Sequence, residues 1–138
     1  MSLAKKIDQL IEQKSLLKHP FYQMWSEGKL SKQMLAGYSK EYFQIVKAVP
    51  EFVATISQYA PQSMIKEIKE NQEEESEHIS PWANFAVSLG VENIESYKGM
   101  QKTTTAVAEL AQLMTSLETG AAAMYAFEDR KSTRLNSS

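Results

Sequence analysis

The sequence predicts an all-α protein. Apolar residues recur at steps of three and four through most of the chain, which is the spacing of one face of an α-helix. No segment alternates apolar and polar residues as a half-buried β-strand does, and no internal repeat is present. The chain has 138 residues, which is enough for one domain and too few for two.

Two short helices are expected first. Apolar residues at helical spacing predict a helix over residues 3–17. Pro20 suits the first turn of a second helix, which carries Tyr22 and ends near Gly28. His19 precedes this proline and is expected to cap the helix or to form the turn before it.

A long helix follows. Ser31 is a suitable N-cap, and a wide apolar face extends from Leu35 to Ile56. Pro50 lies inside this pattern and is expected to kink the helix. The predicted face comprises Leu35, Tyr38, Tyr42, Ile45, Val46, Val49, Phe52, Val53 and Ile56.

Three further helices are predicted. One is expected to begin at Pro61. Another is expected to begin at Pro81 and to end at Gly90. The last helix is expected to run without a break from about Thr104 to Glu128. Its predicted inner residues are Val107, Leu110, Ala111, Met114, Leu117, Ala121 and Met124.

The composition excludes several classes of protein. Hydrophobic residues make up 43% and charged residues 23%, as in ordinary soluble domains. The net charge of −2 and the lack of a long basic run disfavour a nucleic-acid partner. There is no cysteine for a disulfide or a thiolate site, and no apolar run long enough for a membrane span or a signal peptide. We therefore expect a cytoplasmic protein.

Residues 129–138 differ from the rest of the chain. This decapeptide, DRKSTRLNSS, has one apolar residue and departs from the preceding helical periodicity. It resembles a translated library adapter of the kind that ends truncated reading frames. We expect a non-native or disordered tail here, so that residues 1–128 hold the folded domain.

Carboxylates on apolar faces are the main functional signal, because a buried carboxylate is costly unless it is paired, protonated or bound to metal. The 3.6-residue period places Glu75 on the inner face of its helix and Glu74 almost opposite. His78, three residues beyond Glu75, can converge with it on one ligand. In the last helix, the same stepping places Glu128 on the core face. Glu-x-x-His with a further carboxylate suits iron or manganese, although acidic runs are more commonly solvated faces.

Three segments together carry a family resemblance. They are HPFYQMWSEGKLS at 19–31, EHISPWANFAVSLGV at 77–91 and TGAAAMYAFE at 119–128. In this order they resemble the haem-oxygenase-like proteins, which include the TenA thiaminases, the pyrroloquinoline-quinone synthase C group and the chlamydial death-domain-associating proteins, the last being the most similar. The resemblance covers residues 1–128 and implies the N-terminal part of a haem-oxygenase-like helical bundle.

The resemblance also implies a metal centre. Members of this branch hold two iron ions, or iron with manganese. His78 and Glu128 match ligand positions, and Glu75 or Glu74 must serve as the first glutamate, since the family has about one helical turn more before the histidine. A later His/Asp/His ligand group has no counterpart in this chain, so the chain alone is expected to be inactive.

The implied activity is that of an oxygenase. The relatives use O₂ to make para-aminobenzoate for folate from one of their own tyrosines, which matches Tyr22; other members act on small-molecule substrates. A tyrosine that precedes the second glutamate in the family is Phe127 here. The complete protein is expected to be a homodimer.

Other functions stay open. A TenA-type thiamin-salvage hydrolase would use a cysteine, which is absent, and an Asp and a Tyr where this chain has Glu41 and Gln44. A pyrroloquinoline-quinone-type oxidase and a metal-free module that binds partner helices are further possibilities. Tyr22 could also be an ordinary core aromatic beside Trp25.

Overall fold

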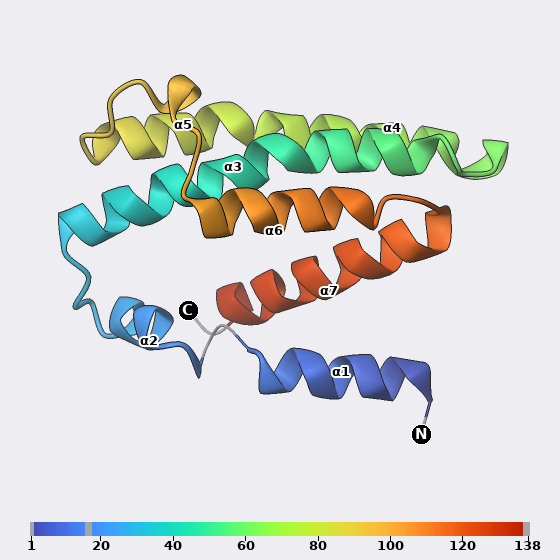
Figure 1. The fold of residues 1–138 in the computed structure, drawn as a ribbon, viewed down its shortest axis with the longest axis horizontal. Coiled ribbons are helices and arrows are strands. Elements are labelled where there is room, and N and C mark those ends of the chain that lie inside the picture. Colours follow the sequence, from blue (N-terminus) through green and yellow to red (C-terminus); the bar gives the residue numbers. More distant parts are fainter. Residues whose placement is uncertain (1, 16–17, 137–138) are drawn as a thin grey trace. The chain divides into compact units, whose positions relative to one another are not determined.

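The computed structural model describes residues 2–15 and 18–136, and the side chains of residues 128–136 lie outside that description. All regular structure in the described residues is helical, so the predicted fold class is confirmed. No helix among these residues has the length and apolar character needed to cross a membrane. The elements are α1 (Leu3–Gln13), α2 (Pro20–Ser26), α3 (Lys32–Ser57), η2 (Gln62–Met64), α4 (Ile65–Glu77), α5 (Ile79–Ser88), η3 (Ile94–Ser96), α6 (Gln101–Gln112) and α7 (Leu117–Asn136) (Figure 1).

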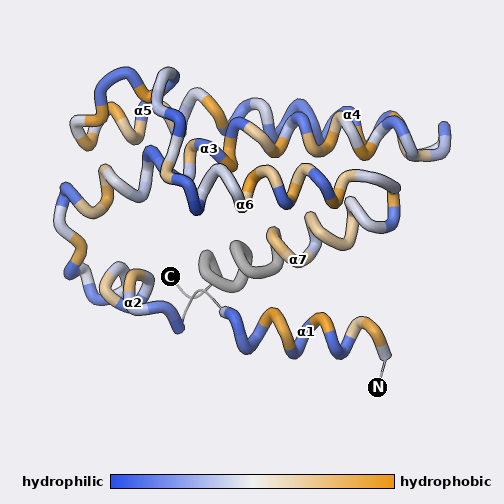
Figure 2. The backbone as a smooth tube through the Cα atoms, viewed as in Figure 1, coloured by the Kyte–Doolittle hydropathy of each residue, from blue (hydrophilic) through white to orange (hydrophobic). Residues whose placement is uncertain are grey.

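The chain forms two compact units. The first combines Met1–Leu30 with Ala121–Ser138, and the second is Ser31–Gly120, so the boundary falls within α7. In the first unit, hydrophobic and hydrophilic residues alternate around α1 with the helical period (Figure 2). The Tyr125 hydroxyl of α7 donates a hydrogen bond to Asp8 of α1 at 3.3 Å. The proposed foreign origin of residues 129–138 stays a prediction.

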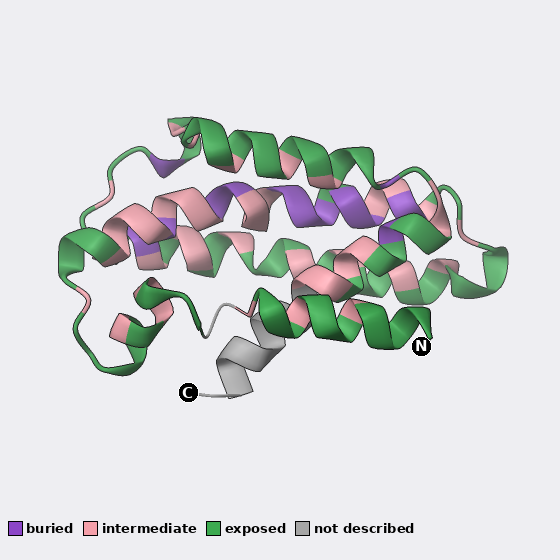
Figure 3. Ribbon diagram, turned by 60° about the horizontal axis from the view of Figure 1, so that its bottom comes forward, coloured by how far each residue is buried: buried purple, intermediate pink, exposed green. Residues whose placement is uncertain are grey.

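Helix α3 is the centre of the second unit. It packs against α4 and α5 along one side and α6 along the other (Figure 1). The buried residues accordingly gather along α3 (Figure 3). Phe43 is fully buried with Ala86 and Ile94, and the Trp82 side chain packs against this cluster. The helix continues through the buried Pro50, which cannot donate a backbone hydrogen bond.

The predicted apolar face of α3 matches the buried residues in the second half of the helix and does not match them in the first half. Four predicted residues, Val49, Phe52, Val53 and Ile56, are buried. Nearer the N-terminus the buried residues are Ser39, Phe43 and Gln44, whereas the predicted tyrosines are only half-buried. The reason is that helices cover α3 from two sides, so a single-face pattern does not describe its burial.

The predicted helix caps are confirmed. The His19 Nδ1 accepts a hydrogen bond from the amide two residues later, and the Ser31 Oγ accepts one from the amide three residues later, both at 3.1 Å. Gly28 and Gly90 follow α2 and α5 with φ of 68° and 91°, a left-handed conformation that glycine adopts without strain.

Several predicted helix boundaries are wrong, among them the start of α5, which lies at Ile79 and not at Pro81. The first helix ends at Gln13. A turn follows, in which the Ser15 amide donates a hydrogen bond to the Glu12 carbonyl, and residues 16–17 lie outside the description. The last expected helix is two helices, α6 and α7, because Ser116 caps α7: its Oγ accepts the Thr119 amide at 3.0 Å. Because α6 and α7 are separate helices, their apolar positions do not form one continuous face. The predicted inner residues Ala111 and Ala121 are exposed.

Candidate metal-binding site

Glu75 lies on the inner face of α4, as the helical period predicts. The half-buried residues at this face recur every three or four positions, while Glu74 is exposed. The Glu75 side chain is 18% exposed. The face comprises Ile65, Ile68, Gln72 and Glu75, and Ile79 at the start of α5 continues the spacing. Among the glutamates of residues 73–77, Glu75 is thus the one whose side chain is half-buried.

His78 connects α4 to α5. It is the C-cap of the first helix and the N-cap of the second, and its own carbonyl accepts the Trp82 amide at 3.2 Å. Its Nδ1 lies 3.3 Å from the Glu75 Oε2, so the two side chains converge as the spacing predicts. The imidazole is 56% exposed, which leaves it open to solvent on one side.

The pair alone is not a complete metal site. Within the described part of the chain, no group of three or more histidine, aspartate or glutamate side chains is arranged to hold a metal ion. The Glu128 side chain lies outside that part, and its helical segment belongs to the other unit. The structure therefore brings Glu75 and His78 together, and Glu128 lies outside what it describes of the side chains. All three ligand assignments stay predictions.

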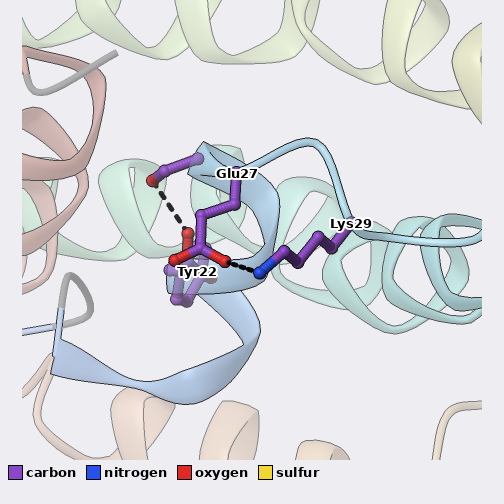
Figure 4. A network of polar contacts seen from close by, with 4 residues as sticks. Tyr22, Glu27 and Lys29 are labelled. Atoms are coloured by element: carbon purple, nitrogen blue, oxygen red, sulfur yellow. Dashed lines mark hydrogen bonds and ion pairs between the residues drawn. The ribbon is translucent and has the colours of Figure 1, made fainter.

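Tyr22 lies in α2, within the first unit, and is half-buried. Its ring stacks on Trp25, with centroids 6.3 Å apart and an angle of 13° between the planes, and meets the edge of Phe21. The Ser26 hydroxyl donates to its carbonyl at 3.0 Å, and Glu27 forms an ion pair with Lys29 at 2.7 Å nearby (Figure 4). Aromatic packing accounts for this placement, and no relation to Glu75 or His78 follows from it.

A second polar cluster joins α3 to the segment before α6, and the sequence did not reveal it. The Glu41 carboxylate accepts hydrogen bonds from the Tyr97 hydroxyl, the Met100 amide at 2.7 Å and the Thr103 hydroxyl at 2.8 Å. Burial raises the pKa of Glu41, but these hydrogen bonds outweigh it and lower the pKa overall. The hydrogen bond to the Glu41 carboxylate raises the pKa of Tyr97 to about 12.

Gln44 reinforces this cluster. Its Nε2 donates to the Tyr97 carbonyl at 3.1 Å and to the Lys40 carbonyl at 3.2 Å. A groove of about 510 Å³ adjoins the cluster, and both Lys40 and Tyr97 line it, together with Gly37 and Gly90. Neither Glu75 nor His78 lines this groove, so it is not part of the candidate metal site.

Comparison with known proteins decides the family. A model of the TENA/THI-4/PQQC family matches residues 4–128. The chain belongs to this family. Among the proteins similar to it, a 4-aminobenzoate synthase of Chlamydia pneumoniae is 37% identical over 131 residues, covering 88% of this chain and 58% of that protein.

More distant relatives carry the same name. A 4-aminobenzoate synthase of Chlamydia muridarum is 30% identical, covering 94% of this chain and 59% of its own length. One of Nitrosomonas europaea is 27% identical, covering 91% of this chain and 58% of its own length. The resemblance seen in the sequence is thus confirmed at family level, and the chain spans less than two thirds of the length of the curated relatives it matches.

Proposed function

We propose that the complete protein is a metal-dependent oxidative enzyme that forms 4-aminobenzoate, with Glu75 and His78 among its metal ligands. Family membership and the names of the relatives support the reaction. The observation that carries the metal assignment is the convergence of the two side chains at 3.3 Å, with the carboxylate on the inner face of α4. Glu128, from α7, is the proposed third ligand of this chain.

The donor set fits iron, or iron with manganese. A carboxylate oxygen and an imidazole nitrogen from one helical turn form one of the two Glu-x-x-His motifs found in helical di-metal proteins. Bound ferrous ions would supply the reduction of O₂. Glu75 would bind as the carboxylate and His78 as the neutral imidazole, since a protonated histidine has no free lone pair for a metal.

Tyr22 is the proposed source of the product's aromatic ring, and a lysine side chain of the complete protein would donate the amino group, as the family resemblance implies. Its packing against Trp25 and Phe21 restricts the orientation of the ring, which is what a residue needs if it is to be oxidised at one position. The complete protein would act as a homodimer, with O₂ as the second substrate.

The direct test follows the tyrosine ring into the product. The complete protein is made with ring-labelled tyrosine, loaded anaerobically with ferrous iron and exposed to O₂, and 4-aminobenzoate is measured by mass spectrometry. We expect labelled product from the unmodified protein and none from Tyr22→Phe. Tyr59→Phe, which changes an exposed tyrosine, should leave the yield unchanged. Unlabelled product, or full yield from Tyr22→Phe, would contradict the proposal.

The hydrolase alternative gains no support. The chain has no cysteine nucleophile, and Glu41 and Gln44, at the positions expected to bind a pyrimidine, are engaged by Tyr97 and its neighbours. A metal-free interaction module predicts that the complete protein binds no iron, so metal analysis separates it from the oxidative enzyme.

A further inference from the structure

We propose that Glu41 is an acid-sensitive latch. In this view its carboxylate holds the segment from Tyr97 to Met100, and the first turn of α6, on the surface of α3. Protonation of the carboxylate would release that segment while α3, α4 and α5 stay folded. This device is independent of the proposed metal chemistry, because neither Glu75 nor His78 belongs to the cluster.

The start of α6 depends on Glu41 because it has no cap of its own. The first amides of a helix lack partners within the helix, and a short polar side chain at the N-cap normally accepts one of them. Here the N-cap is Met100, which makes no side-chain capping bond. The Glu41 Oε1 accepts the Met100 amide at 2.7 Å and the Thr103 hydroxyl at 2.8 Å. A carboxylate from another helix therefore supplies the cap, and its charge also suits a helix N-terminus.

The preceding segment is held at further points. The Tyr97 hydroxyl donates to the other oxygen of Glu41, and Gln44 donates to the Tyr97 carbonyl at 3.1 Å. Gly99 adopts a φ of 82°, and a Cβ built there would lie 3.0 Å from the Gln44 Cγ. The backbone thus lies directly against the Gln44 side chain of α3, and a larger residue would be strained by the positive φ and would have to displace that side chain slightly. Removing the carboxylate's charge would weaken the hydrogen bonds that keep it there.

The direction of the pH effect follows from the charges around Glu41. The charged or titratable groups that face it are Lys40, on its own helix, and Tyr97, on the opposing segment; the Lys40 Nζ lies 4.8 Å above the Tyr97 ring. Hydrogen bonding favours the ionised carboxylate in the folded state, so the pKa of Glu41 is lower when folded than when unfolded. The stabilisation is therefore present above the unfolded pKa and is lost as the pH falls through the folded one.

The rest of the unit does not depend on this carboxylate. Phe43, Ala86 and Ile94 form a buried cluster that ties α3, α5 and η3 together. Ile94 anchors the chain just before the latched segment. Release is therefore expected to begin after η3 and to leave α5 in place.

Amide hydrogen exchange at neutral pH tests the latch. Glu41→Gln keeps the size of the side chain and removes its charge, as protonation does. Because hydrogen bonds to a charged group are stronger than those to a neutral one, we expect exchange in residues 97–104 to become roughly tenfold faster or more, with residues 79–88 unchanged. Glu51→Gln, at an exposed glutamate of the same helix, should change neither segment.

A second variant covers the case in which Glu41→Gln fails to fold. Tyr97→Phe removes one of the three hydrogen bonds and should accelerate exchange in the same segment by a smaller factor. In the unmodified protein, the Met100 amide shift should titrate in acid with the pKa of one carboxyl group, and this titration should be absent from Glu41→Gln. Unchanged exchange in residues 97–104, or equal acceleration in residues 79–88, would overturn the proposal.

Discussion

At the scale of single residues, Glu74 and Glu75 show how one position along a helix changes the environment of a carboxylate. Glu74 is exposed, whereas Glu75 is 18% exposed and lies 3.3 Å from His78. The 100° rotation per residue of an α-helix accounts for this difference. Two otherwise equal carboxylates are therefore a matched pair for testing any role of the inner one.

Trp82 is a residue whose polar atom has a definite structural role. Its Nε1 donates to the Ser39 carbonyl at 2.7 Å, and its ring lies 4.9 Å from that of Tyr42. Trp82→Phe keeps an aromatic ring and removes the donor, so we expect a loss of about 1 kcal/mol or more in the free energy of unfolding. Urea denaturation followed by far-UV circular dichroism measures it. The same change at Trp25, which is 39% exposed, should cost less, and equal losses at both positions would contradict this role.

The convergence of Glu75 and His78 was predictable from the sequence, whereas the separate cluster around Glu41 was not. The inner position of Glu75 and its convergence with His78 follow from local periodicity, which a sequence displays directly. The contacts of Glu41 join residues 56 to 62 positions apart, and no local pattern encodes them. The only signal was a carboxylate beside the apolar face of a long helix, which an exposed glutamate would equally produce.

At the scale of elements, α3 and the first turn of α7 approach each other closely at Gly120. A Cβ built on Gly120 would lie 2.6 Å from the Ile56 Cγ1 and 3.2 Å from the Met114 Sδ. Gly120→Ala should therefore lower the free energy of unfolding by about 1–3 kcal/mol, through overpacking. Chemical denaturation checks this value.

Gly37 provides the control for that substitution. It lies inside α3 with nothing within 4 Å of a built Cβ. Gly37→Ala should stabilise the protein by about 0.5–1 kcal/mol, because alanine loses less conformational freedom in a helix. A stabilising effect of Gly120→Ala would show that the two helices do not approach as closely as described.

The helices themselves were largely predictable, and their ends were less so. Caps such as Ser31 use a side chain and an amide three residues apart, and local sequence encodes that contact. The start of α6 was predicted near Thr104 and lies at Gln101, because its cap comes from Glu41 in another helix. The break before α7 was missed because the apolar spacing continues across Ser116 while its side chain caps a new helix.

At the scale of the whole molecule, burial is concentrated in few elements. Helices α1, α2, α4 and α6 contain no fully buried residue. Most of the stability of a helix in a protein comes from packing of its apolar face, so these helices are weakly held within this chain. We expect the 138-residue chain on its own to be partly molten, with helical far-UV but weak near-UV circular dichroism and strong binding of a hydrophobic dye. The denaturation and hydrogen-exchange tests above are therefore made on the complete protein. A cooperative melt at high temperature would contradict this expectation.

The central claim is that Glu75 and His78 bind iron in the complete protein, and metal analysis after anaerobic loading with ferrous ions tests it most directly. The account predicts about two irons per chain in the unmodified protein. Iron should be markedly depleted in Glu75→Gln and in His78→Ala, and unchanged in Glu74→Gln. Iron near zero in the unmodified protein, or full iron in Glu75→Gln and His78→Ala, would contradict the claim.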